Sequence, residues 1–284
     1  MMTTLWLTTC RTWSNLPDNL TLLVQQLEEQ GVKVIVAPWQ DWQQADWVLP
    51  LCAWDYASHS HAFRAWLMRL AEKGTGVFNP LELVRWNMSK DYLLDLAKVV
   101  EVIPTIVLDA PNPEAFLALI HQKSWSEVVL KPLIGQSGKA VTKWHAMQQT
   151  ALPDFSCYSS GLIVQPYIQE IEQYGETSMV FFNGKFSHAV KRQPPVGEWR
   201  ANSAYGVEVF AITPSAVALA SANQVLQSLP VMPMYARVDG TDILEQGHFL
   251  LNELEVIEPA LYLHTATEAT AQFVQAILNK IRKG

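Results

Sequence analysis

The acidic side chains best suited to chemistry lie in one segment, MYARVDGTDILEQGHFLLNELEVIEP, which runs from Met234 to Pro259. Two runs rich in strand-forming residues, Tyr235 to Leu244 and Phe249 to Ile257, flank the turn signal Glu245-Gln246-Gly247. A hairpin of two antiparallel strands is therefore expected here.

Alternation along these strands brings four charged side chains to one face of the hairpin. With the turn centred near Gln246, Asp239 lies opposite Glu253. Arg237 then lies opposite Glu255. Carboxylates that face each other across a ladder repel unless a cation lies between them, and all-oxygen ligands favour a hard ion such as Mg²⁺ or Mn²⁺. The three acids are therefore predicted to bind a divalent metal.

The alternative is an open edge hairpin whose acids only face water. Apolar residues surround the acids on the second strand: Leu250, Leu251, Leu254, Val256 and Ile257. A strand with one face in water alternates more regularly than this, so the pattern favours the metal site.

A second candidate site combines lysines with a glycine-rich loop. The predicted strand from Glu127 to Lys131 leads through Pro132 into LIGQSGK, residues 133–139, in which Ser137 lies between two glycines. Glycines let backbone N–H groups approach an anion, and lysines supply charge, so the pattern is typical of a phosphate site. The Walker pattern GxxxxGK[ST] is absent, and taken alone the segment fits a flexible surface hairpin better.

Lys90 lies at the start of a helix predicted from Asp91 to Lys98, for which Ser89 is the expected N-cap. A cation at this end of the helix dipole is unfavourable unless it meets an anionic ligand. Exposed lysines are also common there, so Lys90 becomes a phosphate candidate only together with other signals.

Composition excludes several classes of partner. The chain has 284 residues, 49% of them apolar, and a formal net charge of −7, so it can bury a sizeable core in one to three domains. No basic stripe offsets the negative charge, which argues against nucleic acid and membranes as partners. The cysteines Cys10, Cys52 and Cys157 form no CxxC pair, and no signal segment or membrane span is expected, so the expected location is cytoplasmic.

Strands and helices alternate over the first third of the chain, which predicts a parallel α/β unit. The expected strands are 4–9, 32–37, 45–51 and 76–79, and the expected helices are 17–31 and 59–73. Ligands of open α/β sheets gather beyond the carboxyl ends of strands, where Trp54-Asp55-Tyr56 would lie. These residues are expected either to line a substrate site or to cap the sheet.

The remainder of the chain is predicted to be α+β. The expected strands are 105–108, 127–131, 162–166, 176–182 and 185–191, and the expected helices are 113–122, 214–229 and 265–283. Asn183-Gly184 is a strong hairpin signal between two of these strands. The segment 193–206 is expected to be a long functional loop that carries Arg200 and Asn202.

Taken in order along the chain, these segments resemble those of ATP-grasp ligases, most closely the glutathione-synthetase-like carboxylate–amine ligases, a group that includes the ligase closing the D-cycloserine ring. The matching stretches are NPLELVRWNMSKDYLLDLA, VVLKPLIGQSGKAV, IVQPYIQEIEQYGETSMVFFNGKFSHAVKR, GEWRAN, YARVDG and NELEVIEP. The resemblance covers most of the chain and is strongest from Asn79 to Tyr262. It implies an ATP-grasp fold with a parallel α/β domain at 1–88, a small lid domain at 104–166, and an antiparallel-sheet domain formed by 89–103 and 167–284.

The resemblance also implies how ATP would be bound. Lys90 and Lys131 match the lysines that hold the phosphates, with Ser137 in the glycine-rich loop, and Glu176 matches the acidic residue near the ribose. The hinge that reads adenine would consist of Gln165, Pro166, Tyr167 and Ile168.

The catalytic groups implied by the resemblance are mostly cations. Lys191 and Arg200 would face the transferred phosphate, with Asn202 beside them, and Arg237 would stabilise the oxyanion. The ligands of two Mg²⁺ ions, or of Mn²⁺ in their place, would be Asp239, Glu253 and Glu255. A substrate carboxylate would attack ATP to give an acyl phosphate and ADP, and an amine would then displace phosphate.

Three positions depart from the family pattern. Glu255 stands where many members have asparagine, Gln165 replaces an acidic hinge residue, and only Gly206 follows Asn202 in the loop. The implied partners are a small-molecule carboxylate and an amine, and a homodimer is left open.

Two other functions fit part of the pattern. One is a nucleotide-binding regulatory protein with the same fold and no ligase activity. The other is a metal-dependent hydrolase, which leaves both lysines and the glycine-rich loop unexplained.

Overall fold

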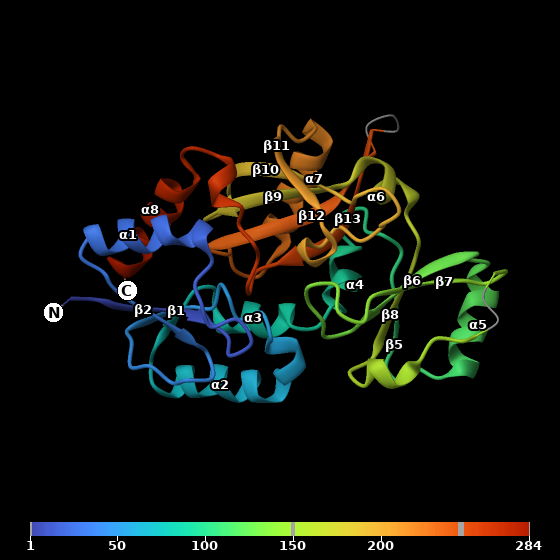
Figure 1. Cartoon of the computed structure of the whole chain (residues 1–284), viewed down its shortest axis with the longest axis horizontal. Helices are drawn as coiled ribbons and strands as arrows, with labels where there is room; N and C mark the ends of the chain where they lie inside the picture. The colour runs from blue at the N-terminus through green and yellow to red at the C-terminus, as the bar shows by residue number, and fades with distance from the viewer. Residues whose placement is uncertain (1, 149–150, 244–246, 284) are drawn as a thin grey trace.

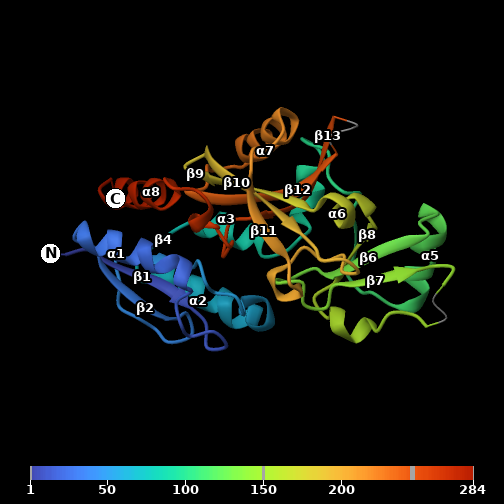
Figure 2. The ribbon, with the colours of Figure 1, turned by 45° about the horizontal axis from the view of Figure 1, so that its top comes forward.

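The computed structural model describes residues 2–148, 151–243 and 247–283, which form three β-sheets with helices packed on them (Figure 1). Figures 1 and 2 place the N-terminal sheet and a small sheet at opposite ends of the molecule, with a five-stranded sheet between them. Within the described part of the chain, no helix combines the length and the apolar character needed to cross a membrane.

The N-terminal sheet is parallel, in the order β2-β1-β3-β4. Its elements are β1 (Thr4–Thr9), η1 (Asp18–Leu20), α1 (Thr21–Glu29), β2 (Lys33–Pro38), β3 (Trp47–Leu49), η2 (Tyr56–His59), α2 (Ser60–Glu72) and β4 (Gly76–Val77). Alternation along β1 sends Leu5 and Leu7 into the core with α1, whereas Trp6 packs edge-on against Trp66 of α2 on the other face. Both faces are covered, which confirms the predicted parallel α/β unit.

The small sheet is antiparallel, in the order β5-β8-β6-β7. Its elements are β5 (Ile106–Leu108), α5 (Pro113–Lys123), β6 (Glu127–Pro132), β7 (Thr142–His145), η3 (Phe155–Tyr158) and β8 (Leu162–Pro166). Helix α5 begins after Asn112, whose side chain accepts a 3.0 Å hydrogen bond from the Ala115 N–H. Its Phe116 packs against Trp144 in the core of this unit.

The five-stranded sheet is antiparallel, in the order β11-β10-β9-β12-β13. Its strands are β9 (Glu176–Phe182), β10 (Lys185–Gln193), β11 (Glu208–Ile212), β12 (Tyr235–Ile243) and β13 (His248–Glu255). The helices around it are α3 (Leu81–Asn87), α4 (Tyr92–Leu96), α6 (Gln169–Tyr174), η4 (Ser203–Tyr205), α7 (Ala216–Ser228), η5 (Leu263–Thr265) and α8 (Ala269–Ile281). Met179 and Phe181 face α7 and α4. On the opposite face, Phe182 stacks on Phe273 of α8 at one end of the sheet, and the other end carries the charged residues of the site.

The register of the β12–β13 hairpin is the one that the sequence predicts. Arg237 pairs with Glu255 and Asp239 pairs with Glu253, before a bulge shifts the ladder by one residue. Of the predicted turn, Glu245 and Gln246 lie outside the described residues. The structure thus has the mixed organisation that the sequence predicts, with a parallel sheet in the N-terminal unit and two antiparallel sheets in the rest of the described chain.

Several local predictions failed, and helix α3 was among the elements that the sequence analysis did not predict. The prediction that Ser89 caps this helix was wrong. Helix α4 begins at Tyr92, and the residue before it, Asp91, makes no side-chain hydrogen bond to the helix end. Segments 142–145 and 208–212 were not predicted and form β7 and β11, two partly exposed edge strands. Helix α6 was also missed, since it is one and a half turns long and has no buried residue to mark a helical period.

Asn79 connects the N-terminal unit to the central sheet. Its side chain is fully buried and donates to the carbonyl oxygens of Tyr235, at 2.8 Å, and Val256, at 2.9 Å. Its carbonyl accepts from the N–H groups of Met234 and Tyr235. The side-chain amide of Asn79 thus satisfies backbone N–H and C=O groups of both strands of the β12–β13 hairpin, just beyond the last pair, Arg237 and Glu255.

Replacing Asn79 with alanine should lower the free energy of unfolding by about 3 kcal/mol or more, since each buried group left without a partner costs about 1–3 kcal/mol. Urea unfolding followed by circular dichroism measures the loss. The matched control is Asn223→Ala, which removes one 2.8 Å bond to Leu219 inside α7 and gains helix propensity. Equal losses in the two variants would contradict the joining role of Asn79.

Candidate active site

A cavity of about 490 Å³ lies where the three sheets meet. It is lined by most of the predicted site residues: Lys90, Lys131, Ser137, Gln165, Pro166, Tyr167, Ile168, Glu176, Arg200, Asn202, Arg237, Glu253 and Glu255. Trp54 and Tyr56 line it from the N-terminal unit, as expected for a substrate wall. Asp55 instead accepts hydrogen bonds from Trp39 and Gln40, both at 2.7 Å, and holds the loop after β3 in place.

The predicted metal ligands form one cluster. Asp239, Glu253 and Glu255 each offer an oxygen, and these oxygens lie within 4.8 Å of one another. Asp239 is fully buried, which excludes the alternative of an open edge hairpin in water. Three converging carboxylates suit a hard divalent cation such as Mg²⁺.

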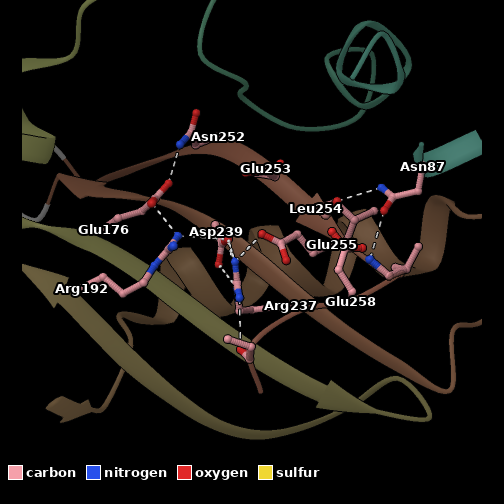
Figure 3. Close-up of polar contacts among 12 residues, drawn as sticks. Asn87, Glu176, Arg192, Arg237, Asp239, Asn252, Glu253, Leu254, Glu255 and Glu258 are labelled. Atoms are coloured by element: carbon pink, nitrogen blue, oxygen red, sulfur yellow. Dashed lines mark hydrogen bonds and ion pairs between the residues drawn. The ribbon is translucent and has the colours of Figure 1, made fainter. Parts of the chain in front are cut away.

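Two arginines compensate the buried acids (Figure 3). Arg237 donates to Asp239, with Nη2 to Oδ2 at 2.8 Å, and to Glu255. Arg192 pairs with Asp239 at 3.0 Å and with Glu176. Burial alone would raise the pKa of Asp239, but the two guanidinium groups outweigh burial and hold that pKa below its ordinary value.

Glu255 is less well compensated. Burial raises its pKa to about 7, and the charges of Glu253 and Asp239 add to this, while Arg237 opposes it. A carboxyl group with this pKa exchanges its proton near neutrality. Binding of a metal there would remove the proton.

Both predicted lysines point at the same acidic face. Lys90 forms an ion pair with Glu253, and Lys131 donates to Asn252 Oδ1 at 2.8 Å. Asn252 in turn donates to Glu176. Burial lowers the pKa of Lys131 to about 8; the charge of Glu253 opposes this shift, and the charge of Lys90 adds to it.

The predicted hinge borders an apolar part of the cavity. Gln165 Nε2 donates to Thr105 Oγ1 at 2.9 Å, which leaves the side-chain carbonyl of Gln165 to accept from a ligand. The Tyr167 ring lies 4.1 Å from Lys143 Nζ. The apolar side chains around this part are Ile103, Val129, Ile168, Ile171 and Leu254. The combination suits a flat heterocycle with an amino group.

The loop after β10 reaches the glycine-rich loop. Arg200 binds Glu198 through two contacts, at 2.9 and 2.8 Å, and its guanidinium lies 3.6 Å from the centre of the Tyr205 ring. Tyr205 donates to the Gly138 carbonyl at 3.2 Å. Gly138 has φ +69°, and a Cβ there would lie 2.7 Å from Asn202 Oδ1, so only glycine permits this contact.

The structure does not bring Lys191 to the acids. Its Nζ donates to Thr177 at 2.9 Å, and strand alternation places both side chains on the opposite face of the sheet. Arg192 lies on the acidic face instead, opposite Glu176. A shift in register between Phe186 and His188 causes the exchange, because a regular ladder from the Asn183-Gly184 turn would pair Lys191 with Glu176.

The sequence prediction also missed Asn252 and Thr105, which hold Lys131 and Gln165. The signal for Asn252 was its place beside Glu253 on a strand already identified. Thr105 carried no such signal, because its contact with Gln165 joins residues 60 positions apart.

Comparisons with known proteins agree with this geometry. The sequence profile of the prokaryotic glutathione synthetase ATP-grasp domain matches residues 94–284, and that of the N-terminal domain of D-cycloserine synthetase DcsG matches residues 5–79. The chain belongs to the prokaryotic glutathione synthetase ATP-grasp family. It is an ATP-dependent ligase of the class that forms C–N bonds.

Full-length relatives of this ATP-grasp protein include the cycloserine biosynthesis protein DcsG of Streptomyces lavendulae, which is 28% identical over 92% of this chain and 93% of the relative. The crystal structure of D-cycloserine synthetase DcsG superposes with a TM-score of 0.85 at 26% identity, covering 98% of this chain and 99% of that one. The ATP-grasp ligase PsnB, solved with a phosphomimetic variant of its minimal precursor, Mg and ADP, shares the fold, with a TM-score of 0.64 at 14% identity over 98% of this chain and 99% of that one.

Replacing Asp239 with asparagine in this ATP-grasp protein should lower the free energy of unfolding by about 3–5 kcal/mol, because two buried guanidinium groups lose their shared counter-charge. Urea unfolding without nucleotide or metal measures the loss. Asp95→Asn is the matched control, since it breaks a surface ion pair with Lys98 and should change stability by only about 0.5 kcal/mol. A small loss in Asp239→Asn would show that the arginines do not depend on this carboxylate.

Proposed function

We propose that the protein joins a small amino-acid-like carboxylate to an amine or a related nucleophile through an acyl phosphate, and that it releases ADP and phosphate. The observation that carries this proposal is that one cavity brings together all the groups that the reaction needs. Its lining includes the apolar slot beside Gln165, whose side-chain carbonyl can accept from a ligand, the two lysines Lys90 and Lys131, Arg200 of the loop 193–206 (the arginine loop), and the carboxylates of Glu253 and Glu255. A nucleotide-binding regulator would need the apolar slot and the two lysines. It would not need Arg200 in the cavity wall, because it transfers no phosphate.

ATP would bind with its adenine in the slot beside Gln165. Glu176, which lines the same cavity beside Asn252 and Arg192, would contact the ribose, and Lys90 and Lys131 would hold the phosphates. The lowered pKa of Lys131 supports this placement, since a neighbouring phosphate would favour the charged lysine and raise that pKa.

Mg²⁺ is the proposed metal, and Mn²⁺ has the same preference for oxygen ligands. Asp239, Glu253 and Glu255 would hold it, and their cluster fits a hard cation in both charge and spacing. When bound, the metal would neutralise the phosphate oxygens.

The proposed reaction needs cations more than it needs a protein nucleophile. The substrate carboxylate attacks the γ-phosphorus of ATP, the bond to ADP breaks, and an acyl phosphate forms. The amine then attacks the acyl carbon, loses a proton and expels phosphate. Arg200 and Arg237 both line the cavity, where they would stabilise the negative charge that builds up in the two steps.

The proposed domain organisation follows the sheets. Residues 1–88 would form the substrate side of the cavity, 104–166 a lid that carries the hinge and the glycine-rich loop, and 89–103 with 167–284 the metal-binding domain. The proposed substrate is small, because the cavity of about 490 Å³ must hold both ATP and the acid.

Lys131→Met should reduce kcat/KM for ATP by about 10²–10³-fold, the usual effect of removing one charged donor from a preorganised site. Release of ADP and phosphate, screened with pools of amino acids and amines, measures turnover, and mass spectrometry identifies the product. Lys98→Met, at a side chain that is 74% exposed, is the matched control and should leave the rate unchanged. ATP binding without any product from the pools would refute the proposed reaction on small amino-acid-like carboxylates.

Affinity for Mg²⁺ should rise with pH through the pKa of Glu255, which is about 7. Below this pH the metal must displace a proton, so the apparent association constant should rise about tenfold per pH unit, and it should level off above pH 7. Titration of the nucleotide-free protein with Mg²⁺ between pH 5.5 and pH 8.5 measures this dependence. Glu255→Gln should lose most of the slope, and an unchanged slope in that variant would assign the proton to another group.

A further inference from the structure

Gln165 is a buried amide in the wall of the apolar slot. It lies on β8, the strand between β5 and β6 in the small sheet (Figure 1). Its side chain is 1% exposed and lines the cavity. Within the described residues, its one side-chain hydrogen bond runs from Nε2 to Thr105 Oγ1. The carbonyl end of this amide is therefore open to a ligand in the slot.

An amide has two different ends, so a glutamine recognises a ligand only when its orientation is fixed. The NH₂ end donates hydrogen bonds and the carbonyl end accepts them. A carboxylate at the same position would accept at both ends and would need no such control. The partner on the far side of Gln165 therefore decides which end of the amide faces the slot.

Thr105 fixes this orientation through a second hydrogen bond. Its Oγ1 donates to the backbone carbonyl of Ile103 at 2.7 Å. A carbonyl can only accept and a hydroxyl has one hydrogen, so the hydrogen of Thr105 is committed to Ile103. Thr105 Oγ1 can then only accept from Gln165, at 2.9 Å, which requires the NH₂ end of Gln165 to face Thr105. The carbonyl end must face the slot.

The carbonyl of Ile103 belongs to a segment that the central sheet holds in place. The N–H of Ile103 donates to the carbonyl of Leu251 on β13 at 2.9 Å. The N–H of Leu251 donates in turn to the carbonyl of Glu101 at 2.9 Å. The acceptor for the Thr105 hydroxyl is therefore fixed. Thr105 does not line the cavity, so it would act on a ligand only through Gln165.

We propose that Thr105 is a positioning residue that determines base specificity: by holding the carbonyl of Gln165 toward the slot, it selects a purine with an amino group at C6 over one with an oxygen there. This inference rests on the proposed function, which places adenine beside Gln165. The 6-amino group of adenine would donate to the carbonyl. The 6-oxygen of hypoxanthine would face it as a second acceptor, and neither oxygen would have a hydrogen to share.

A purely structural role of Thr105 in the small sheet makes a different prediction. Valine has nearly the shape of threonine but neither donates nor accepts a hydrogen bond through its side chain. In Thr105→Val the amide of Gln165 could therefore turn its NH₂ end toward the slot, where it would accept a 6-oxygen and reject a 6-amino group. A structural role alone would weaken the binding of both bases by the same factor.

Calorimetric titration with ATP and with ITP, each with Mg²⁺ and without an acid substrate, tests the proposal. ITP carries an oxygen at C6 in place of the amino group of ATP. The wild-type protein should bind ATP at least about 30-fold more tightly than ITP, because ITP leaves the carbonyl of Gln165 unpaired. In Thr105→Val this preference should fall about tenfold, with weaker binding of ATP and tighter binding of ITP. Thr105→Ala gives the same test if the valine variant does not fold.

Three controls isolate the effect of the hydroxyl. Thr105→Ser keeps the hydroxyl and should keep the preference for ATP. Thr142→Val is the same substitution on β7 of the same sheet, where Thr142 contacts the Tyr158 hydroxyl at 3.0 Å outside this cavity, and it should leave both affinities unchanged. In a Gln165→Met background, which has no amide to turn, Thr105→Val should leave the ratio of the two affinities unchanged. Thermal unfolding of each variant shows whether the fold is kept.

The outcomes separate this proposal from the ligase itself. Equal losses of affinity for ATP and ITP in Thr105→Val, or the same change of their ratio in the Gln165→Met background, would refute the positioning role. Equal binding of ATP and ITP by the wild-type protein, or binding of neither, would also refute it. If Gln165→Met changes neither affinity, the base lies elsewhere, and the placement of adenine beside Gln165 fails together with the proposal. The ligase reaction is tested separately, by the formation of product in the presence of ATP.

Discussion

The charge balance around Asp239 is the constraint on which the rest of the site depends. This carboxylate is fully buried and shared by Arg192 of β10 and Arg237 of β12. Buried ion pairs add little net stability, but an ion left without its partner is strongly destabilising. The strands that supply these groups must therefore keep their register to one residue. The shift between Phe186 and His188 is part of that constraint, because it turns Arg192 to the acidic face.

The same balance bears on how ligands enter the proposed site. Without ligands, the carboxylates pair with cations of the protein, such as Lys90 with Glu253 and Arg237 with Glu255. A metal ion alone would take the carboxylates and leave these cations buried without partners. A phosphate group alone would do the reverse. A metal-bound triphosphate brings both signs, so its binding exchanges one set of ion pairs for another at little cost in uncompensated charge.

The sequence predicted best where one rule decided the outcome. Alternation with a turn near Gln246 predicted the pairing of Asp239 with Glu253, which the structure reaches through a bulge next to Gly240. The covered parallel strands followed from alternating strands and helices. The family resemblance assigned the site role to Lys191, and nothing in the sequence marked the bulge between Phe186 and His188 that turns Arg192 to the acidic face. The meeting of Lys90 with Glu253, 163 positions apart, could not follow from periodicity at all. The order of motifs and the family resemblance supplied that part.

The position of the cavity between three sheets connects the fold to the proposed chemistry. An acyl phosphate reacts with water as well as with an amine, so a ligase must limit the access of water while the amine arrives. The glycine-rich loop, residues 133–139, and the loop 193–206 that carries Arg200 meet beside the cavity, where Gly138 approaches Asn202 and Tyr205. A side chain at position 138 would separate these loops. The proposed lid would thus depend on Gly138 for closure, just as the proposed metal site depends on the bulge in β10 that turns Arg192 to the acidic face.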